Sequence, residues 1–312
     1  MKNILCVGPL PRRYLEQLLE RYTGHLYWKA NSPQALLQEV GSEIHAIVST
    51  AWNPVRRDLI EALPNLEIIC NYGVGYDNID VAAATQRGVK VTNTPDVLTE
   101  DVADFAMTLV MALLRKVVHG DHFARSGRWQ NKEKFSLGVS QRGKNLGIIG
   151  LGRIGAAIAT RATGFGMDVL YTGPRQKQNV SYPYVDNVID LAQASDVLVG
   201  ACPGGEQTYH LINKDVLHAL GENGYMVNIA RGSVVDEGAL CDALQHNVIA
   251  GAALDVFENE PHIPEALKRM DNVILQPHQA SATVETRAAM AECVLQNLAM
   301  WFAEKKCLTA VN

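Results

Sequence analysis

Cysteine is scarce in this chain and is not spaced for metal binding or cross-linking. The 312 residues include six cysteines, no two of which form a Cys-x-x-Cys pair, and most of them lie in apolar runs. Disulfide-rich secreted domains and zinc sites both show denser, regularly spaced cysteines. We therefore expect free thiols, no disulfide, no metal site and a reducing, cytoplasmic location.

An excess of positive charge is also absent. The chain has 28 Lys and Arg against 33 Asp and Glu, and both signs are interspersed along it. A nucleic acid or an anionic membrane surface as the main partner would need a basic patch. The apolar run at residues 4–7 is too short for a signal peptide, and no repeat or low-complexity tract is present. The composition predicts a globular protein that holds any bound anion with local groups.

The length and the apolar runs predict two α/β domains. At 312 residues the chain exceeds the usual size of one hydrophobic core. Short β-branched runs alternate with helical patterns, which predicts parallel sheets covered by helices on both faces. The expected strands are residues 3–7, 46–49, 66–70, 89–92, 146–149, 169–171, 197–200, 226–229, 252–255 and 273–275.

Two helical stretches suggest how the domains divide. The pattern predicts one long helix from Thr99 to about Arg125, which we interpret as the joint between the domains. The last helix, from about Val284 to Phe302, follows the final strand and is expected to return to the first domain. We therefore predict a substrate domain of residues 1–98 plus 285–312 and a dinucleotide-binding domain of residues 99–284.

A glycine-rich turn marks the dinucleotide site. Asn145 to Gly155 reads as a buried strand, a G-x-G-x-x-G turn and a helix start. In this motif Gly150 permits the turn, Gly152 lets the backbone approach a pyrophosphate, and Gly155 lets the helix pack on the strand. The helix N-terminus then offers N–H groups and partial positive charge to the phosphates.

The end of the next strand predicts the choice of cofactor. An NAD-specific site carries an Asp or Glu there for the ribose hydroxyls, but this chain has Thr172-Gly173-Pro174-Arg175. Arg175 can bind a 2′-phosphate through charge-assisted hydrogen bonds. We therefore predict NADP as cofactor, with NADPH preferred over NADH. The alternative is that Arg175 is an ordinary loop arginine and that the site does not distinguish the two cofactors.

Three ionisable residues follow successive predicted strands: Arg231, Glu260 and His278. The carboxyl ends of parallel strands line one crevice, so these side chains are expected to converge. A 2-oxo acid needs a forked cation for its carboxylate, which Arg231 offers, and an acid for its carbonyl oxygen, which His278 offers. Glu260 beside the ring would orient it and favour its protonated form. The alternative is a structural ion pair between Arg231 and Glu260.

Several motifs in one order resemble the D-specific 2-hydroxyacid dehydrogenase family, especially its glyoxylate/hydroxypyruvate and hydroxyphenylpyruvate reductase branch. The matching stretches cover the chain from about residue 70 to residue 290 and comprise residues 71–80, 91–104, 147–155, 228–232, 253–257 and 277–278. The chain departs from many relatives at Gln279-Ala280-Ser281, which concerns the pocket wall, and at Cys202-Pro203-Gly204-Gly205, which concerns the pyrophosphate contacts.

The resemblance implies a flavodoxin-like substrate domain, a Rossmann dinucleotide-binding domain with the active site in a cleft between them, and a homodimer through the latter. It implies that Arg231, Glu260 and His278 are catalytic, that backbone groups of Val74 and Gly75 hold the substrate carboxylate, and that Asp255 faces the nicotinamide. Glu260 stands where formate dehydrogenases carry glutamine, which argues against formate.

Motifs and resemblance together give two sets of predicted binding residues. Those for the substrate are Trp52, Val74, Gly75, Arg231 and Ser281. Those for the cofactor are Thr99, Gly150, Leu151, Gly152, Arg153, Ile154, Gly155, Gly173, Pro174, Arg175, Cys202, Pro203, Thr208, Ile229, Ala230, Asp255 and His278.

The function predicted from the sequence is NADP(H)-dependent reduction of glyoxylate, hydroxypyruvate or a bulkier 2-oxo acid to a D-2-hydroxy acid. One alternative is an NAD-linked D-2-hydroxyacid dehydrogenase of the same family. The other is a dinucleotide-sensing binding protein, since a fold alone does not fix function. The complete set of Arg231, Glu260 and His278 weighs against the sensor.

Overall fold

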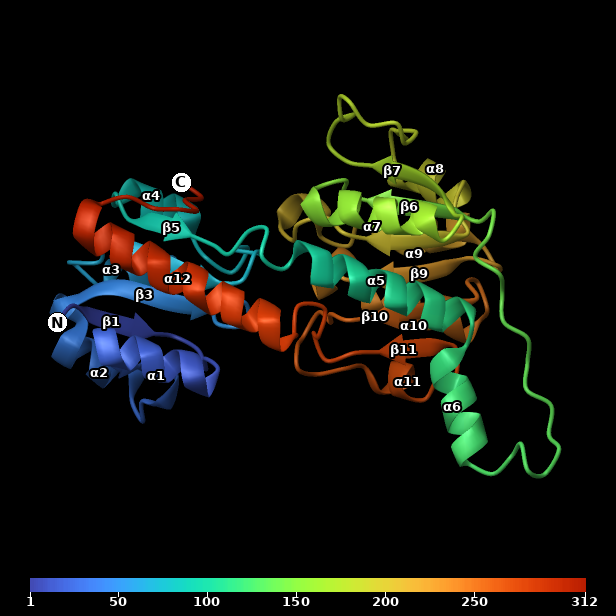
Figure 1. The fold of residues 1–312 in the computed structure, drawn as a ribbon, viewed down its shortest axis with the longest axis horizontal. Coiled ribbons are helices and arrows are strands. Elements are labelled where there is room, and N and C mark those ends of the chain that lie inside the picture. Colours follow the sequence, from blue (N-terminus) through green and yellow to red (C-terminus); the bar gives the residue numbers. More distant parts are fainter. The chain divides into compact units, whose positions relative to one another are not determined.

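The computed structural model describes all 312 residues, and the chain divides into two compact units (Figure 1). Unit 1 comprises Met1–Leu98 together with Thr283–Asn312, and unit 2 comprises Thr99–Ala282. The boundary predicted at residue 285 lies two residues beyond the start of the returning segment. No helix combines the length and apolarity needed to span a bilayer.

Unit 1 is built on a parallel sheet with the strand order β2-β1-β3-β4-β5. Its strands are β1 (Asn3–Cys6), β2 (Thr23–Leu26), β3 (Ile44–Thr50), β4 (Ile68–Tyr72) and β5 (Lys90–Thr92). This is the flavodoxin-like order, so the predicted fold class is confirmed for this unit. The edge strand β2 was not expected, because Thr-Gly-His-Leu lacks a β-branched run; pairing with β1 forms it.

Helices cover both faces of this sheet. One face carries α1 (Arg12–Arg21) and α12 (Val284–Glu304), and the other packs against α2 (Pro33–Val40), α3 (Arg57–Glu61) and α4 (Val81–Gln86). The hydroxyl of Thr283 accepts the N–H of Thr286 and so caps the start of α12. The C-terminal helix is therefore an integral part of unit 1.

Unit 2 is built on a six-stranded parallel sheet with the order β11-β10-β9-β8-β6-β7. Its strands are β6 (Asn145–Ile149), β7 (Asp168–Thr172), β8 (Val197–Gly200), β9 (Tyr225–Asn228), β10 (Gly251–Leu254) and β11 (Val273–Leu275). The chain runs one way from β6 to β7 and the other way from β8 to β11. Ligands of such sheets bind beyond the carboxyl ends of the strands at this reversal.

The helices of unit 2 also lie in two layers. In Figure 1, α5 (Thr99–Leu114) and α7 (Arg153–Gly164) lie side by side along one face. The other face packs against α8 (Val188–Gln193), α9 (Lys214–Leu220) and α10 (Glu237–Gln245), and α11 (Glu265–Lys268) precedes β11. The predicted Rossmann architecture is confirmed.

The single helix predicted from Thr99 to Arg125 is wrong. The structure has α5 ending at Leu114 and a separate helix α6 (Val117–Arg125), with Lys116 left-handed at φ 53°. The Leu114 carbonyl instead accepts the N–H of Val139, so a returning loop satisfies the end of α5. Helix α5 packs on α7 within unit 2.

Candidate active site

The turn after β6 has the close contacts that the glycine motif requires. Gly150 is left-handed at φ 96°, and a Cβ there would lie 2.8 Å from the Cα atom of Cys202. A Cβ on Gly155 would overlap the carbonyl oxygen of Gly150, whereas one on Gly152 would meet nothing within 4 Å. The turn is thus packed behind Gly150 and Gly155 and open in front of Gly152, where a pyrophosphate would approach.

Gly152 is the N-cap residue of α7 and has no side chain with which to cap it. The predicted residues Arg153 and Ile154 open this helix, and the N-terminus of a helix attracts an anion. The loop after β8 closes on itself, because the Thr208 hydroxyl donates to the carbonyl of Pro203 at 2.8 Å. Burial raises the pKa of the Cys202 thiol in this loop to about 11.

Two tyrosine hydroxyls hold the backbone of the loop after β7, and the space around Gly173 is open. The Tyr184 hydroxyl donates to the Gly173 carbonyl at 2.9 Å, and the Tyr171 hydroxyl accepts the N–H of Lys177 at 2.8 Å. A Cβ on Gly173 would meet nothing within 4 Å, so the backbone admits a larger side chain there. Arg175 is exposed in the middle of this loop.

His278 and Glu260 form a hydrogen-bonded pair. Nδ1 of His278 lies 2.8 Å from Oε2 of Glu260, and both side chains are about four-fifths buried, at 21% and 17% exposure. The other carboxylate oxygen, Oε1, accepts the N–H of Phe257 at 3.0 Å. The carboxylate therefore fixes the orientation of the ring through Nδ1.

Asp255 holds the turn that carries His278. Its carboxylate is fully buried and accepts the N–H groups of Gln279 at 2.6 Å and Ala280 at 2.9 Å. Its own carbonyl accepts the N–H of His278, which is left-handed at φ 55°. Burial raises the pKa of Asp255, and the two backbone donors oppose that rise. Asp255 therefore maintains an unusual backbone conformation at His278.

Arg231 leaves β9 through a turn shaped by Asn228, a residue not among the predicted site residues. The buried Asn228 amide donates to the Arg231 carbonyl at 2.9 Å, and its oxygen accepts the N–H of Ala230 at 3.1 Å. A Cβ on Gly232 would overlap the backbone of Phe257, so this segment packs directly on the loop that ends at Glu260. An Asn at a strand end, where its amide can close a turn, was the available signal.

A second acid–histidine pair supports the same loop and was also missed. Nε2 of His210 lies 2.9 Å from Oε1 of Glu258, which also accepts the Tyr209 hydroxyl at 3.2 Å. The Glu258 N–H donates to the carboxylate of Glu237 at 2.8 Å, and burial raises the pKa of Glu237. No local sequence pattern joins these positions, because they come from separate loops.

The remaining predicted residues are divided between the units. Trp52, Val74 and Gly75 belong to unit 1, where Trp52 is half exposed, and Ser281 and Thr99 belong to unit 2. Ile229, Ala230 and Leu151 are buried; the first two follow β9 and the third lies in the glycine turn. Pro174 stands beside Arg175 in the loop after β7.

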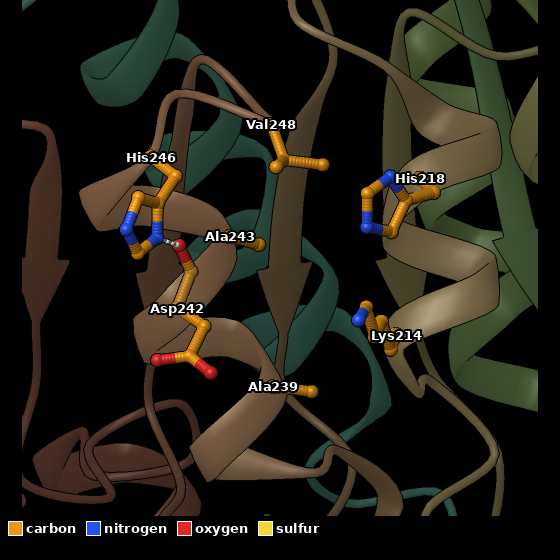
Figure 2. A pocket seen from close by; sticks show the side chains of 7 residues that line it. All are labelled: Lys214, His218, Ala239, Asp242, Ala243, His246 and Val248. Atoms are coloured by element: carbon orange, nitrogen blue, oxygen red, sulfur yellow. Dashed lines mark hydrogen bonds between the residues drawn. The ribbon is translucent and has the colours of Figure 1, made fainter.

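One hollow lies among residues that were not predicted for the site. Figure 2 shows a hollow between α9 and α10, lined in part by Lys214, His218, Asp242 and His246, none of which is a predicted site residue. No group of three or more His, Cys, Asp or Glu side chains is placed to hold a metal ion. The pair His119 and His122, which could suggest a metal, flanks Asp121, whose carboxylate instead binds Arg125.

Comparison with known proteins gives one consistent result. The family described as "D-isomer specific 2-hydroxyacid dehydrogenase, NAD binding domain" matches residues 107–280. A glyoxylate/hydroxypyruvate reductase of Arabidopsis thaliana is 48% identical over 99% of this chain and 98% of its own length. The hydroxyphenylpyruvate reductase of Plectranthus scutellarioides is 44% identical, with the same shares covered. The crystal structure of an NADPH-dependent glyoxylate/hydroxypyruvate reductase from Sinorhizobium meliloti, in complex with NADP and malonate, matches at TM-score 0.92 and 42% identity, covering 99% of this chain and 96% of its own.

Proposed function

Because the chain belongs to the D-isomer specific 2-hydroxyacid dehydrogenase family, we propose that it reduces small 2-oxo acids to D-2-hydroxy acids with NADPH. The proposed substrates are glyoxylate and hydroxypyruvate, or a bulkier 2-oxo acid. The observation that carries the proposal is the His278–Glu260 pair at 2.8 Å, on a loop packed against the segment of Arg231. A protein that only sensed the dinucleotide would not need this proton-transfer pair.

The residues divide the work of the reaction. Nε2 of His278 gives a proton to the carbonyl oxygen of the substrate during reduction and takes it back during oxidation. Glu260 holds the ring through Nδ1 and so orients it. Arg231 binds the substrate carboxylate with two parallel N–H donors. Bound NADPH, held by the turn at Gly150–Gly155 and the loop after β7, supplies the hydride.

A substrate panel tests the proposal. Initial rates with glyoxylate, hydroxypyruvate, pyruvate and phenylpyruvate should be measured with NADPH and with NADH. We expect turnover of at least one of the small 2-oxo acids with NADPH. Tight cofactor binding without turnover of any of them would favour the dinucleotide sensor instead.

The preference for NADPH rests on the loop after β7. A carboxylate at the end of this strand would repel a 2′-phosphate, and Gly173 supplies none. Arg175, exposed two residues further on, offers charge-assisted hydrogen bonds to the phosphate. Hydrogen bonds to charged groups are worth about 1.5–3 kcal/mol each, which predicts a preference of at least about tenfold in kcat/KM.

Two substitutions in this loop should move the preference in a known direction. Arg175→Ala should lose most of the advantage of NADPH while leaving kcat/KM with NADH nearly unchanged. Gly173→Asp should favour NADH, and the open space around Gly173 means that the loop need not move. Steady-state kinetics with both cofactors measure this, with the exposed Arg142→Ala as control. An NADPH preference that survives Arg175→Ala would contradict the assignment.

We also propose that two copies associate through the arm formed by α6 and residues 127–139 of unit 2. In Figure 1 this arm extends beyond the sheet of its unit. It is held together by a contact between Phe123 and Phe135, yet it leaves Trp129 at 73% and Leu137 at 90% exposure. Exposed apolar groups gathered on one segment are typical of an interaction surface. In a symmetric dimer the same surface of a second copy would cover them.

Light scattering coupled to size-exclusion chromatography tests the arm. We expect a dimer for the wild type and a monomer for Leu137→Asp. Ile189→Asp, which changes an exposed side chain on α8 of the same unit, is the matched control and should stay dimeric. A monomeric wild type, or a Leu137→Asp protein that remains dimeric, would refute the proposed interface.

A further inference from the structure

The loop that follows β4 has its carbonyl groups held by side-chain amides. Nδ2 of Asn71 donates to the carbonyls of Gly73 at 3.1 Å and Gly75 at 2.8 Å. Nδ2 of Asn93 donates to the carbonyl of Val74, between them, at 2.9 Å. Three successive carbonyl groups of one loop are therefore bound by two asparagine side chains of unit 1.

Both amides are themselves fixed by neighbours. Asn71 is fully buried, and its Oδ1 accepts the hydroxyl of the equally buried Ser49 at 3.1 Å, which leaves the NH2 group to face the loop. Asn93 is held through its backbone, because its carbonyl accepts the Thr309 hydroxyl at 2.6 Å and its N–H donates to the Thr309 carbonyl. The two donors thus stand on a rigid frame.

Because the peptide bond is planar, holding these carbonyls also fixes the direction of two N–H groups. In a trans peptide the carbonyl of one residue and the N–H of the next point in opposite directions. Fixing the carbonyls of Gly73 and Val74 therefore points the N–H groups of Val74 and Gly75 away from the amides. Neither N–H makes a hydrogen bond within the protein, and both residues are partly exposed.

We propose that Asn71 and Asn93 are positioning residues that turn the Val74 and Gly75 N–H groups outward to receive the substrate carboxylate. The inference rests on the proposed function for the identity of the ligand. The amides touch neither substrate nor cofactor. They fix the directions of two donors before the ligand arrives, so that binding does not have to order the loop.

The test measures KM and kcat separately in two variants and compares the changes. Asn93→Ala releases the Val74 carbonyl. Asn71→Leu releases the Gly75 carbonyl and leaves the Gly73 carbonyl with the N–H of Thr94 as its one remaining donor. We expect KM for the 2-oxo acid to rise about tenfold or more, because a hydrogen bond to a carboxylate is weakened, with a smaller change in kcat. The Kd for NADPH should stay at the wild-type value. Asn65→Ala, which removes an exposed amide bound to the Ser42 carbonyl of the same unit, should change neither.

Malonate binding, measured by calorimetry, separates this inference from the proposed activity. Malonate needs no turnover, and its Kd should rise in parallel with KM in both variants. A folded Asn93→Ala protein with wild-type KM and malonate affinity overturns the inference even if Asn71→Leu fails to fold. Weakening of NADPH and malonate to the same extent also overturns it, because that indicates general destabilisation. A wild type that binds malonate but turns over no 2-oxo acid refutes the proposed function alone.

Discussion

Replacing His278 with alanine is expected to lower kcat for reduction by about two to four orders of magnitude, the usual contribution of general acid–base catalysis. The Nδ1 atom of this ring is bound to Glu260, and Nε2 is the proposed proton donor that the variant loses. Cofactor affinity should change far less. His246→Ala, in the hollow between α9 and α10, is the control and should behave as wild type.

A second variant tests the role of Glu260 in the same pair. Glu260→Gln keeps the side-chain shape but removes the negative charge that faces Nδ1 of His278. We expect kcat for reduction to fall, because the ring loses its charged hydrogen-bond partner. Steady-state kinetics at saturating NADPH measure the change. A His278→Ala or Glu260→Gln enzyme that retains most of kcat would remove the pair from the mechanism.

Substituting lysine for Arg231 should raise KM for the 2-oxo acid sharply, by about 10- to 100-fold, since a single ammonium cannot copy the paired donors of a guanidinium. We also expect kcat to fall, because a carboxylate held at one point lets the carbonyl move relative to the hydride donor. Steady-state kinetics at saturating NADPH measure both constants. The exposed Arg269→Lys is the matched control.

The contrary outcome for Arg231 has a definite meaning. If Arg231→Lys keeps the wild-type kcat/KM, the charge serves only the structure, as in an ion pair. A loss of activity accompanied by a fall in melting temperature would also indicate a structural role, because the turn at Asn228 and Gly232 packs tightly. Retained stability with a raised KM supports the carboxylate anchor.

The sequence could predict the glycine turn and the strand ends because each is a local pattern. Gly150 and Gly155 have the close contacts that their spacing implies, and Glu260 and His278 meet as expected of residues that follow neighbouring parallel strands. The family, the two parallel-sheet domains and the Rossmann fold are confirmed by the comparisons. The catalytic roles themselves stay predictions.

What the sequence could not predict depends on contacts between distant segments. Asn93 and His210 bind the Val74 carbonyl and the Glu258 side chain, which are 19 and 48 residues away along the chain. The helix break at Lys116 depends on Val139 returning to satisfy the end of α5, which periodicity does not register. The edge strand β2 forms because it pairs with β1, although its own residues do not make up a β-branched run.

Tyr171 and Tyr184 hold the loop after β7, which is proposed to select the cofactor, apart from the residues proposed for catalysis. The two hydroxyls hold the backbone at Gly173 and Lys177, and a larger side chain at Gly173 would meet no atom within 4 Å. The groups proposed to perform the chemistry stand on the loops after β9, β10 and β11, at a different part of the same sheet edge. Substitutions in this one short loop could therefore change the proposed preference between NADPH and NADH while the His278–Glu260 pair stays as it is.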